Sequence, residues 1–74
     1  MKPQGVFLFH TTTAALRGEK ALLAAGLPAK LIPTPRQFSS DCGMALRFDW
    51  EHCEQAARLL RDAGVEVGDV RQLT

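Results

Sequence analysis

Two alanine-rich segments of this chain each end in alanine, and each is followed directly by a glycine and then an aliphatic residue. The first segment covers residues 14–25 and ends before Gly26, and the second covers residues 50–63 and ends before Gly64. A glycine directly after a periodic apolar segment is typical of a helix C-terminus, because glycine adopts the left-handed conformation there at little cost. We therefore predict two helices, each leading directly into a strand.

Four further segments have the composition of β-strands. Residues 5–10 are apolar and aromatic, and residues 43–49 alternate apolar and other side chains with the period of two that a strand requires. Residues 27–34 contain two prolines, which restrict that segment to a short edge strand because proline cannot donate to the ladder. Residues 65–73 are predicted as the last strand.

The ends and faces of the two helices also follow from the sequence. The run Thr11-Thr12-Thr13 offers N-cap side chains to the first helix, and Asp49 offers one to the second. On the first helix we predict that three leucines share the buried face, namely Leu16, Leu22 and Leu23. On the second, Cys53 begins an apolar face at helical spacing.

The resulting element order is strand, helix, strand, strand, helix, strand. The fold that best closes this order is an α+β, ferredoxin-like βαββαβ sandwich. It has a four-stranded antiparallel sheet in the order 4-1-3-2, with both helices on one face and right-handed crossovers. We expect one domain spanning residues 1–74, since a chain of this length has room for only one modest core.

Charge and composition exclude several classes of function. The net charge is +1, which argues against nucleic acid as a partner, because phosphate binding needs a basic surface. Base stacking on Phe7 and Phe9 is therefore less favoured than core packing. The apolar run at 6–9 is too short to span a membrane, and no secretory signal precedes it. We expect a cytoplasmic protein with free thiols.

The predicted topology brings one group of polar residues to a single edge of the sheet. The end of the first strand, the start of the first helix and the start of the third strand all lie there. Helix N-termini and cationic neighbours lower the pKa of a cysteine, so this edge favours a thiolate, although the adjacent Asp41 opposes it. The residues predicted to converge are His10, Thr11, Thr12, Arg36, Ser39, Ser40 and Cys42.

Each of these residues also has a plainer interpretation. Serine, aspartate and glycine are ordinary loop residues, and a cysteine among them can be idle. Cys53 is expected to be buried in the core. We predict no metal site, because a structural zinc needs four ligands and His10 and Cys42 are the only candidates at that edge, while His52 lies at the other end.

Two stretches of the sequence resemble a known family. They are Pro33 to Phe48, with its Pro-Arg, Ser-Ser, Cys-Gly and Ala-Leu-Arg-Phe elements, and Phe7 to Leu23. Together they are similar to the small bacterial proteins described as selenium/sulfur (Se/S) carrier-like, over roughly 6–73. The resemblance implies that Cys42 accepts sulfur or selenium as a persulfide or selenosulfide, with Ser39, Ser40, Gly43 and Arg47 as its motif neighbours.

A carrier of this kind needs an exposed thiol, no cofactor and no second catalytic residue. Its partners would be a sulfur or selenium donor, such as a cysteine desulfurase, and an acceptor that the sequence does not name. A non-enzymatic carrier therefore fits this small chain better than an autonomous enzyme. The alternative is a small regulatory or ligand-binding module in which Cys42 has no chemical role.

We also predict a homodimer. If both helices cover one face of the sheet, the other face exposes apolar side chains of the first strand, and such patches usually mark an interface. The residues expected beside them are Lys30, Ile32, Ala45, Arg47 and Glu66.

Overall fold

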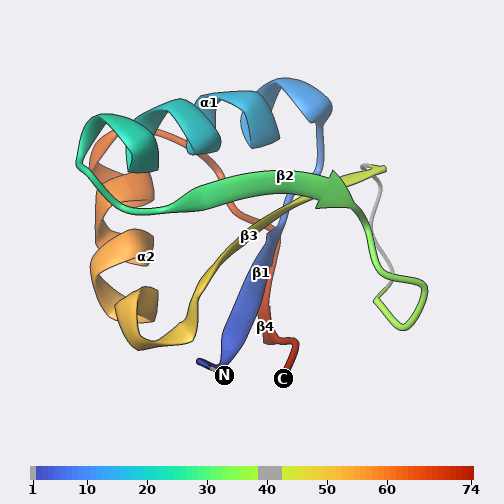
Figure 1. The fold of residues 1–74 in the computed structure, drawn as a ribbon. Helices are drawn as coiled ribbons and strands as arrows, with labels where there is room; N and C mark the ends of the chain where they lie inside the picture. The colour runs from blue at the N-terminus through green and yellow to red at the C-terminus, as the bar shows by residue number, and fades with distance from the viewer. Residues whose placement is uncertain (1, 39–42) are drawn as a thin grey trace.

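The computed structural model describes residues 2–38 and 43–74. Its elements follow the predicted order, with one short 3-10 helix, η1, inserted before the second α-helix (Figure 1). They are β1 (Gln4–Leu8), α1 (Thr12–Ala24), β2 (Ala29–Pro33), β3 (Met44–Asp49), η1 (Trp50–His52), α2 (Cys53–Asp62) and β4 (Asp69–Gln72).

The four strands form one antiparallel sheet in the order β2-β3-β1-β4, which is the predicted order 4-1-3-2. β3 pairs with β1 through Leu8 opposite Ala45, and β4 pairs with β1 through Phe7 opposite Val70. β2 is an edge strand, as the prolines of the predicted segment 27–34 indicated. The predicted α+β fold class is therefore confirmed.

The helix ends also confirm the sequence signals. Thr11 is the N-cap of α1, and its hydroxyl accepts a hydrogen bond from the Ala14 amide at 3.1 Å. Gly26 and Gly64 have φ of 81° and 73°, the left-handed conformation expected after a helix. Asp49 does precede η1, but its side chain makes no capping hydrogen bond, so the prediction that it caps a helix is only half right.

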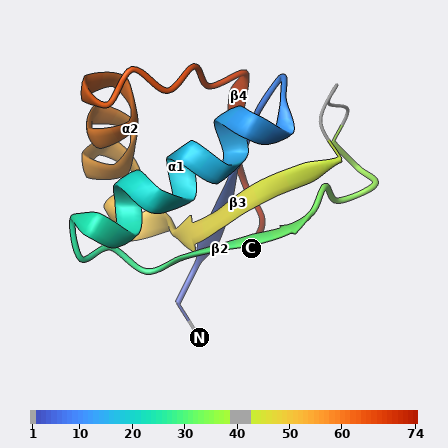
Figure 2. The ribbon, with the colours of Figure 1, turned by 90° about the horizontal axis from the view of Figure 1, so that it is seen from above.

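Both helices lie on one face of the sheet, where the main core forms (Figure 2). Phe7 and Phe48 stack at its centre, with ring centroids 4.4 Å apart. Leu22 of α1 and Leu60 of α2 are fully buried and belong to the same core cluster as these two rings. α1 packs over β2 and β3, whereas α2 packs chiefly against α1 and η1. The helix layer thus covers β2 and β3 more completely than it covers β4.

The predicted buried face of α1 is wrong for two of its three leucines. Leu16 and Leu23 are 48% and 52% exposed, and the residues that α1 buries completely or nearly so are Ala15, Gly18 and Leu22. The reason is close packing: a Cβ placed on Gly18 would lie 3.1 Å from Phe9 Cζ and 3.3 Å from Leu60 Cδ2. Two small residues, Ala15 and Gly18, therefore face the core together with Leu22.

The last strand is shorter than predicted. Val65, Glu66 and Val67 are not part of β4, which begins at Asp69. Val65 instead continues the end of α2, because its amide donates to the Leu60 carbonyl at 2.9 Å. The segment rejoins the sheet at Gly68, whose amide donates to the Leu8 carbonyl at 2.7 Å.

The face without helices carries a second, smaller apolar cluster. Val6, Leu8 and Ala45 form its floor and are at most 4% exposed. Ile32, Phe38 and Leu73 pack against them. The prediction that this face leaves apolar side chains of β1 exposed is therefore wrong, because the segment after β2 and the C-terminus cover them. The homodimer predicted from that exposure stays a prediction.

Candidate functional site

The segment between β2 and β3 is closed at its base by one backbone hydrogen bond. The Thr34 amide donates to the Gly43 carbonyl at 3.0 Å, which extends the pairing of Pro33 with Met44 by one more pair. Gly43 is exposed, and a Cβ built on it would meet nothing within 4 Å. The backbone directly after Cys42 is therefore open to an approaching group.

At the end of the sheet where the convergence was predicted, the structure places His10, Thr11, Thr12 and Gly43. Leu8 of β1 pairs with Ala45 of β3. His10 comes two residues after Leu8 and Gly43 two residues before Ala45, so both lie at the same end of the sheet. α1 starts at this end too, after its cap Thr11. Thr12 is the first residue of the helix. The Thr11 hydroxyl, however, is engaged in capping.

His10 lies toward β4 at this edge. Its imidazole adjoins Gly68, since a Cβ built on that glycine would lie 3.3 Å from His10 Nε2. His10 is itself exposed. It is thus placed where the segment that follows α2 rejoins the sheet.

The two arginines of the predicted site lie apart. Arg36 is exposed in the turn that follows β2. Arg47 lies within β3, paired with both Val6 and Lys30, and it shares the helix-free face with Ala45. It is therefore inside the sheet and not in the turn. Ser39, Ser40 and Cys42 lie outside the described residues, so their place in the site stays a prediction.

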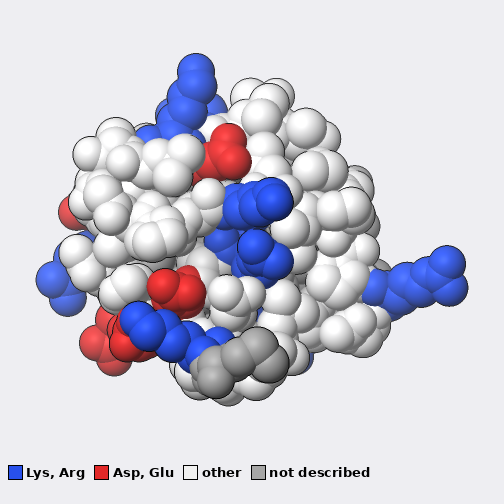
Figure 3. Space-filling view, in the orientation of Figure 1, with Lys and Arg blue, Asp and Glu red and all other residues white. Residues whose placement is uncertain are grey.

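Basic side chains meet on the helix-free face. Lys30 and Arg47 are directly opposite in the register, and like charges in such positions repel. Among the side chains that the structure describes, neither forms a salt bridge, whereas Arg71 on β4 pairs with Asp69 at 2.9 Å. Figure 3 shows Lys and Arg side chains gathered over β2 at the centre of the view.

Cys53 is half-buried at the start of α2, where it packs against the main core. Cys53 therefore lies against the core as predicted, but its side chain is less buried than predicted. Burial, together with the neighbouring Glu54 carboxylate, raises the pKa of the Cys53 thiol above its ordinary value. At neutral pH this side chain is therefore a thiol, which is a poor nucleophile.

A group of potential metal ligands lies near the N-terminus. Asp49, Glu51 and His52 each place one ligand atom within 4.8 Å of the others. Lys2 forms a salt bridge with one of these ligands, because its ammonium lies 3.1 Å from Glu51 Oε1. The positive charge of Lys2 disfavours a cation there, and three ligands are fewer than a structural zinc requires.

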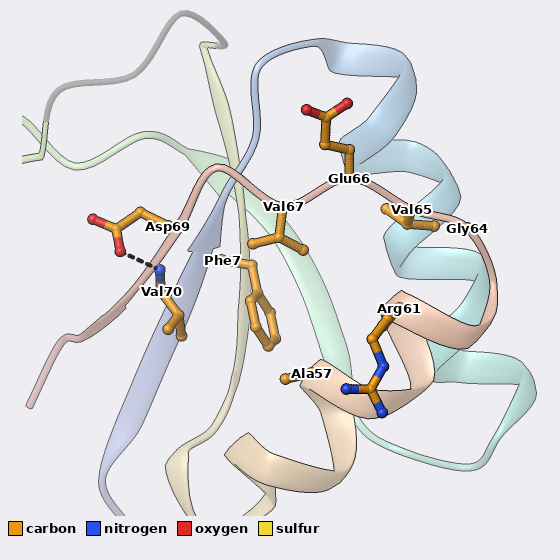
Figure 4. A pocket seen from close by; sticks show the side chains of 9 residues that line it. All are labelled: Phe7, Ala57, Arg61, Gly64, Val65, Glu66, Val67, Asp69 and Val70. Carbon is orange, nitrogen blue, oxygen red and sulfur yellow. Dashed lines mark hydrogen bonds between the residues drawn. The ribbon is translucent and has the colours of Figure 1, made fainter.

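A pocket of about 440 Å³ opens on the helix side of β4 (Figure 4). It lies between α2, the segment that follows it, and the paired strands β1 and β4. This pocket was not predicted from the sequence, because residues 65–67, which line it, were predicted as part of the last strand. Its apolar lining residues are Phe7, Ala57, Val65, Val67 and Val70, and its charged ones are Arg61, Glu66 and Asp69.

No helix in the described part of the chain has the length and apolar character needed to cross a membrane.

Comparison with known proteins agrees with the resemblance of the two sequence stretches. The model of the family described as "Putative Se/S carrier protein-like" matches residues 4–71. The chain belongs to this family. The match covers the whole sheet except the last residue of β4 and includes both helices, so the assignment is to the domain and not to an isolated motif.

One curated relative is the protein named "Uncharacterized protein YtiA" from Escherichia coli (strain K12). It is 35% identical over 48 residues, which are 65% of this chain and 53% of that protein. The match thus spans about half the length of that relative. No solved structure matches the chain.

Proposed function

We propose that this protein carries sulfur or selenium on Cys42 and passes it between partner proteins. The observation that carries the proposal is the contrast between its two cysteines. Cys53 packs against the core and has a raised pKa, whereas Cys42 lies in the Cys-Gly element through which the sequence resembles the family. Cys42 directly precedes Gly43, whose Cβ position is open. A carrier thiol needs that access and Cys53 lacks it.

The loading step that we propose is a transfer between two sulfur atoms. The Cys42 thiolate attacks the outer sulfur of a donor persulfide. A new S–S bond forms on Cys42 as the donor's S–S bond breaks. The donor leaves as a thiolate with the electron pair of that bond, and the transferred sulfur keeps its proton. No external oxidant or reductant is required, and release to an acceptor thiol repeats the same exchange.

Two features favour the thiolate form of Cys42, whereas the negative charge of the adjacent Asp41 opposes it. The N-terminus of α1 lies at the same end of the sheet as Gly43, and a helix N-terminus stabilises a nearby anion. Arg36 adds a positive charge to the segment that contains Cys42. We expect the donor to be a persulfide-forming enzyme such as a cysteine desulfurase, working in the cytoplasm.

The proposal is tested by loading the protein with sulfur. Wild type, Cys42→Ser and Cys53→Ser are each incubated with a cysteine desulfurase and free cysteine, and their intact masses are measured before and after reduction. Wild type and Cys53→Ser should gain sulfur that a reductant removes. Cys42→Ser should gain none. Equal gain on Cys42→Ser and wild type would contradict the proposal.

The second candidate is a small-molecule binding module. The pocket beside α2 supports this second function, because it offers a binding site whose lining residues do not include Cys42. The two functions can coexist in one domain.

A further inference from the structure

The pocket beside α2 exists because the helix layer leaves one part of the sheet uncovered. α2 packs chiefly against α1 and η1, so it contributes little cover to β4. The segment that follows α2 crosses this space without joining the sheet. It is fixed at both ends, by the hydrogen bond from Val65 N to Leu60 O at 2.9 Å and by the one from Gly68 N to Leu8 O at 2.7 Å. Hydrogen bonds of the backbone therefore hold this wall of the pocket in place.

The lining of the pocket is mostly apolar, with one basic residue and two acidic ones. Phe7 forms its floor, and Val67 and Val70 contribute half-buried side chains (Figure 4). Its volume of about 440 Å³ is within the range of small-molecule sites. Such sites combine apolar walls with a few polar groups that fix orientation.

Arg61 is the basic residue among those that line the pocket. Its only ion pair among the described residues is with the adjacent Asp62, at 3.9 Å between Nε and Oδ1, and both side chains are largely exposed. An exposed pair at that distance is weak, so the guanidinium remains able to bind another carboxylate. The acidic residues Glu66 and Asp69 also line the pocket, but their carboxylates point away from its apolar floor (Figure 4).

An added peptide strand is a poor occupant of this region. The Val70 amide on β4 already donates to Asp69 Oδ1 at 2.8 Å, so it cannot pair with an incoming strand. Asp69 is held in that position by Arg71, whose Nε lies 2.9 Å from Asp69 Oδ2. A charged side chain on an edge strand is a common defence against strand addition.

We propose that this pocket binds a small monocarboxylate with an apolar body. The apolar body lies on Phe7 between Val67 and Val70, and the carboxylate pairs with the Arg61 guanidinium at the rim. This site is independent of Cys42, and the proposal stands or falls separately from sulfur transfer.

The test is a titration of the ¹⁵N-labelled Cys42→Ser protein, which removes thiol chemistry from the experiment. The probes are 3-phenylpropanoate, 3-phenyl-1-propanol and 3-phenylpropylammonium, which share one apolar body and differ in charge. The carboxylate should shift the amide signals of Val67 and Val70 saturably. The alcohol should bind about fivefold more weakly, and the ammonium more weakly still.

Two variants separate the roles of Arg61 and of the cavity. Arg61→Gln should abolish the preference for carboxylate over alcohol, whereas Arg58→Gln, an exposed change on the same helix outside the pocket, should retain it. Ala57→Trp, which fills the pocket from α2, should remove binding of every probe. Equal binding of the three probes, or saturable shifts confined to the opposite face of the sheet, would overturn the proposal.

Discussion

The Thr34 amide and the Gly43 carbonyl are joined by a hydrogen bond of 3.0 Å that closes the base of the segment containing Cys42. Gly43 does this without the left-handed backbone that Gly26 and Gly64 adopt. Its side-chain position is also open. Nothing at Gly43 itself therefore requires glycine for the fold.

We therefore expect Gly43→Ala to be stabilising. Alanine restricts the unfolded chain, and a compatible site gains about 0.4–1 kcal/mol in free energy of unfolding from this change. Gly26→Ala is the matched control, because its φ of 81° should make the same substitution destabilising by about 1–2 kcal/mol. Urea denaturation measures both. A loss of stability in Gly43→Ala equal to that in Gly26→Ala would show that the conformation assigned to Gly43 is wrong.

Gly5 should be far less tolerant than Gly43. A Cβ at this position would clash with the indole of Trp50 and would lie 3.0 Å from the Arg71 carbonyl. Overpacking of this kind typically costs about 1–3 kcal/mol. Gly5→Ala should therefore lower the urea midpoint and shift the emission of Trp50, the only tryptophan, to longer wavelength. Unchanged emission and stability would argue against the packing of Trp50 on β1.

The two cysteines should differ in their rate of alkylation. The pKa of Cys53 is raised by burial and by Glu54, so its reactive thiolate is scarce at neutral pH and increases only as pH rises toward that raised pKa. In Cys42→Ser, iodoacetamide should thus react slowly at pH 7 and much faster at pH 10. Cys53→Ser, which retains Cys42, should react at least several-fold faster than Cys42→Ser at pH 7. The reverse order at pH 7 would contradict the assignment of the carrier thiol.

Arg36 should support sulfur loading through its charge. Arg36→Ala is expected to slow loading of Cys42 by about two- to fivefold, in line with the modest strength of exposed charge interactions. The control is Arg17→Ala on the solvent side of α1, where the arginine donates to the Ala63 carbonyl at 3.5 Å. Single-turnover loading followed by mass spectrometry gives both rates. Equal slowing in the two variants would indicate a general effect of charge and not a local one.

Much of the fold could be predicted because the residues that end its helices and restrict its edge strand act locally. Gly26 and Gly64 mark helix ends by their backbone conformation, and the prolines at 28 and 33 mark an edge strand by the amide hydrogens they lack. These signals need no knowledge of what packs against them. The order of elements and the sheet topology followed from them.

The errors arose where tertiary packing decides the outcome. Leucine at 16 and 23 of α1 is exposed because Gly18 allows Phe9 to approach the helix, which makes the small residues the buried ones. Residues 65–67 alternate like a strand, yet they follow the helix end and wall a pocket.

The candidate site was predicted only in part for the same reason. The edge at which His10, Thr11 and Gly43 meet follows from topology. Arg47, in contrast, belongs to the sequence element that resembles the family, yet it lies within β3 and not in the turn. The cover that Phe38 provides on the helix-free face depends on a loop contact that no periodicity encodes.

The most direct test of the carrier proposal locates the added sulfur by residue. After loading with a desulfurase and cysteine, free thiols and persulfides are alkylated and the protein is digested with trypsin under non-reducing conditions. Cleavage after Arg36, Arg47 and Arg58 separates Cys42, in peptide 37–47, from Cys53, in peptide 48–58. We predict the additional sulfur in peptide 37–47 alone. Its appearance in peptide 48–58, or in neither peptide while Cys42 remains freely alkylated, would contradict the proposal.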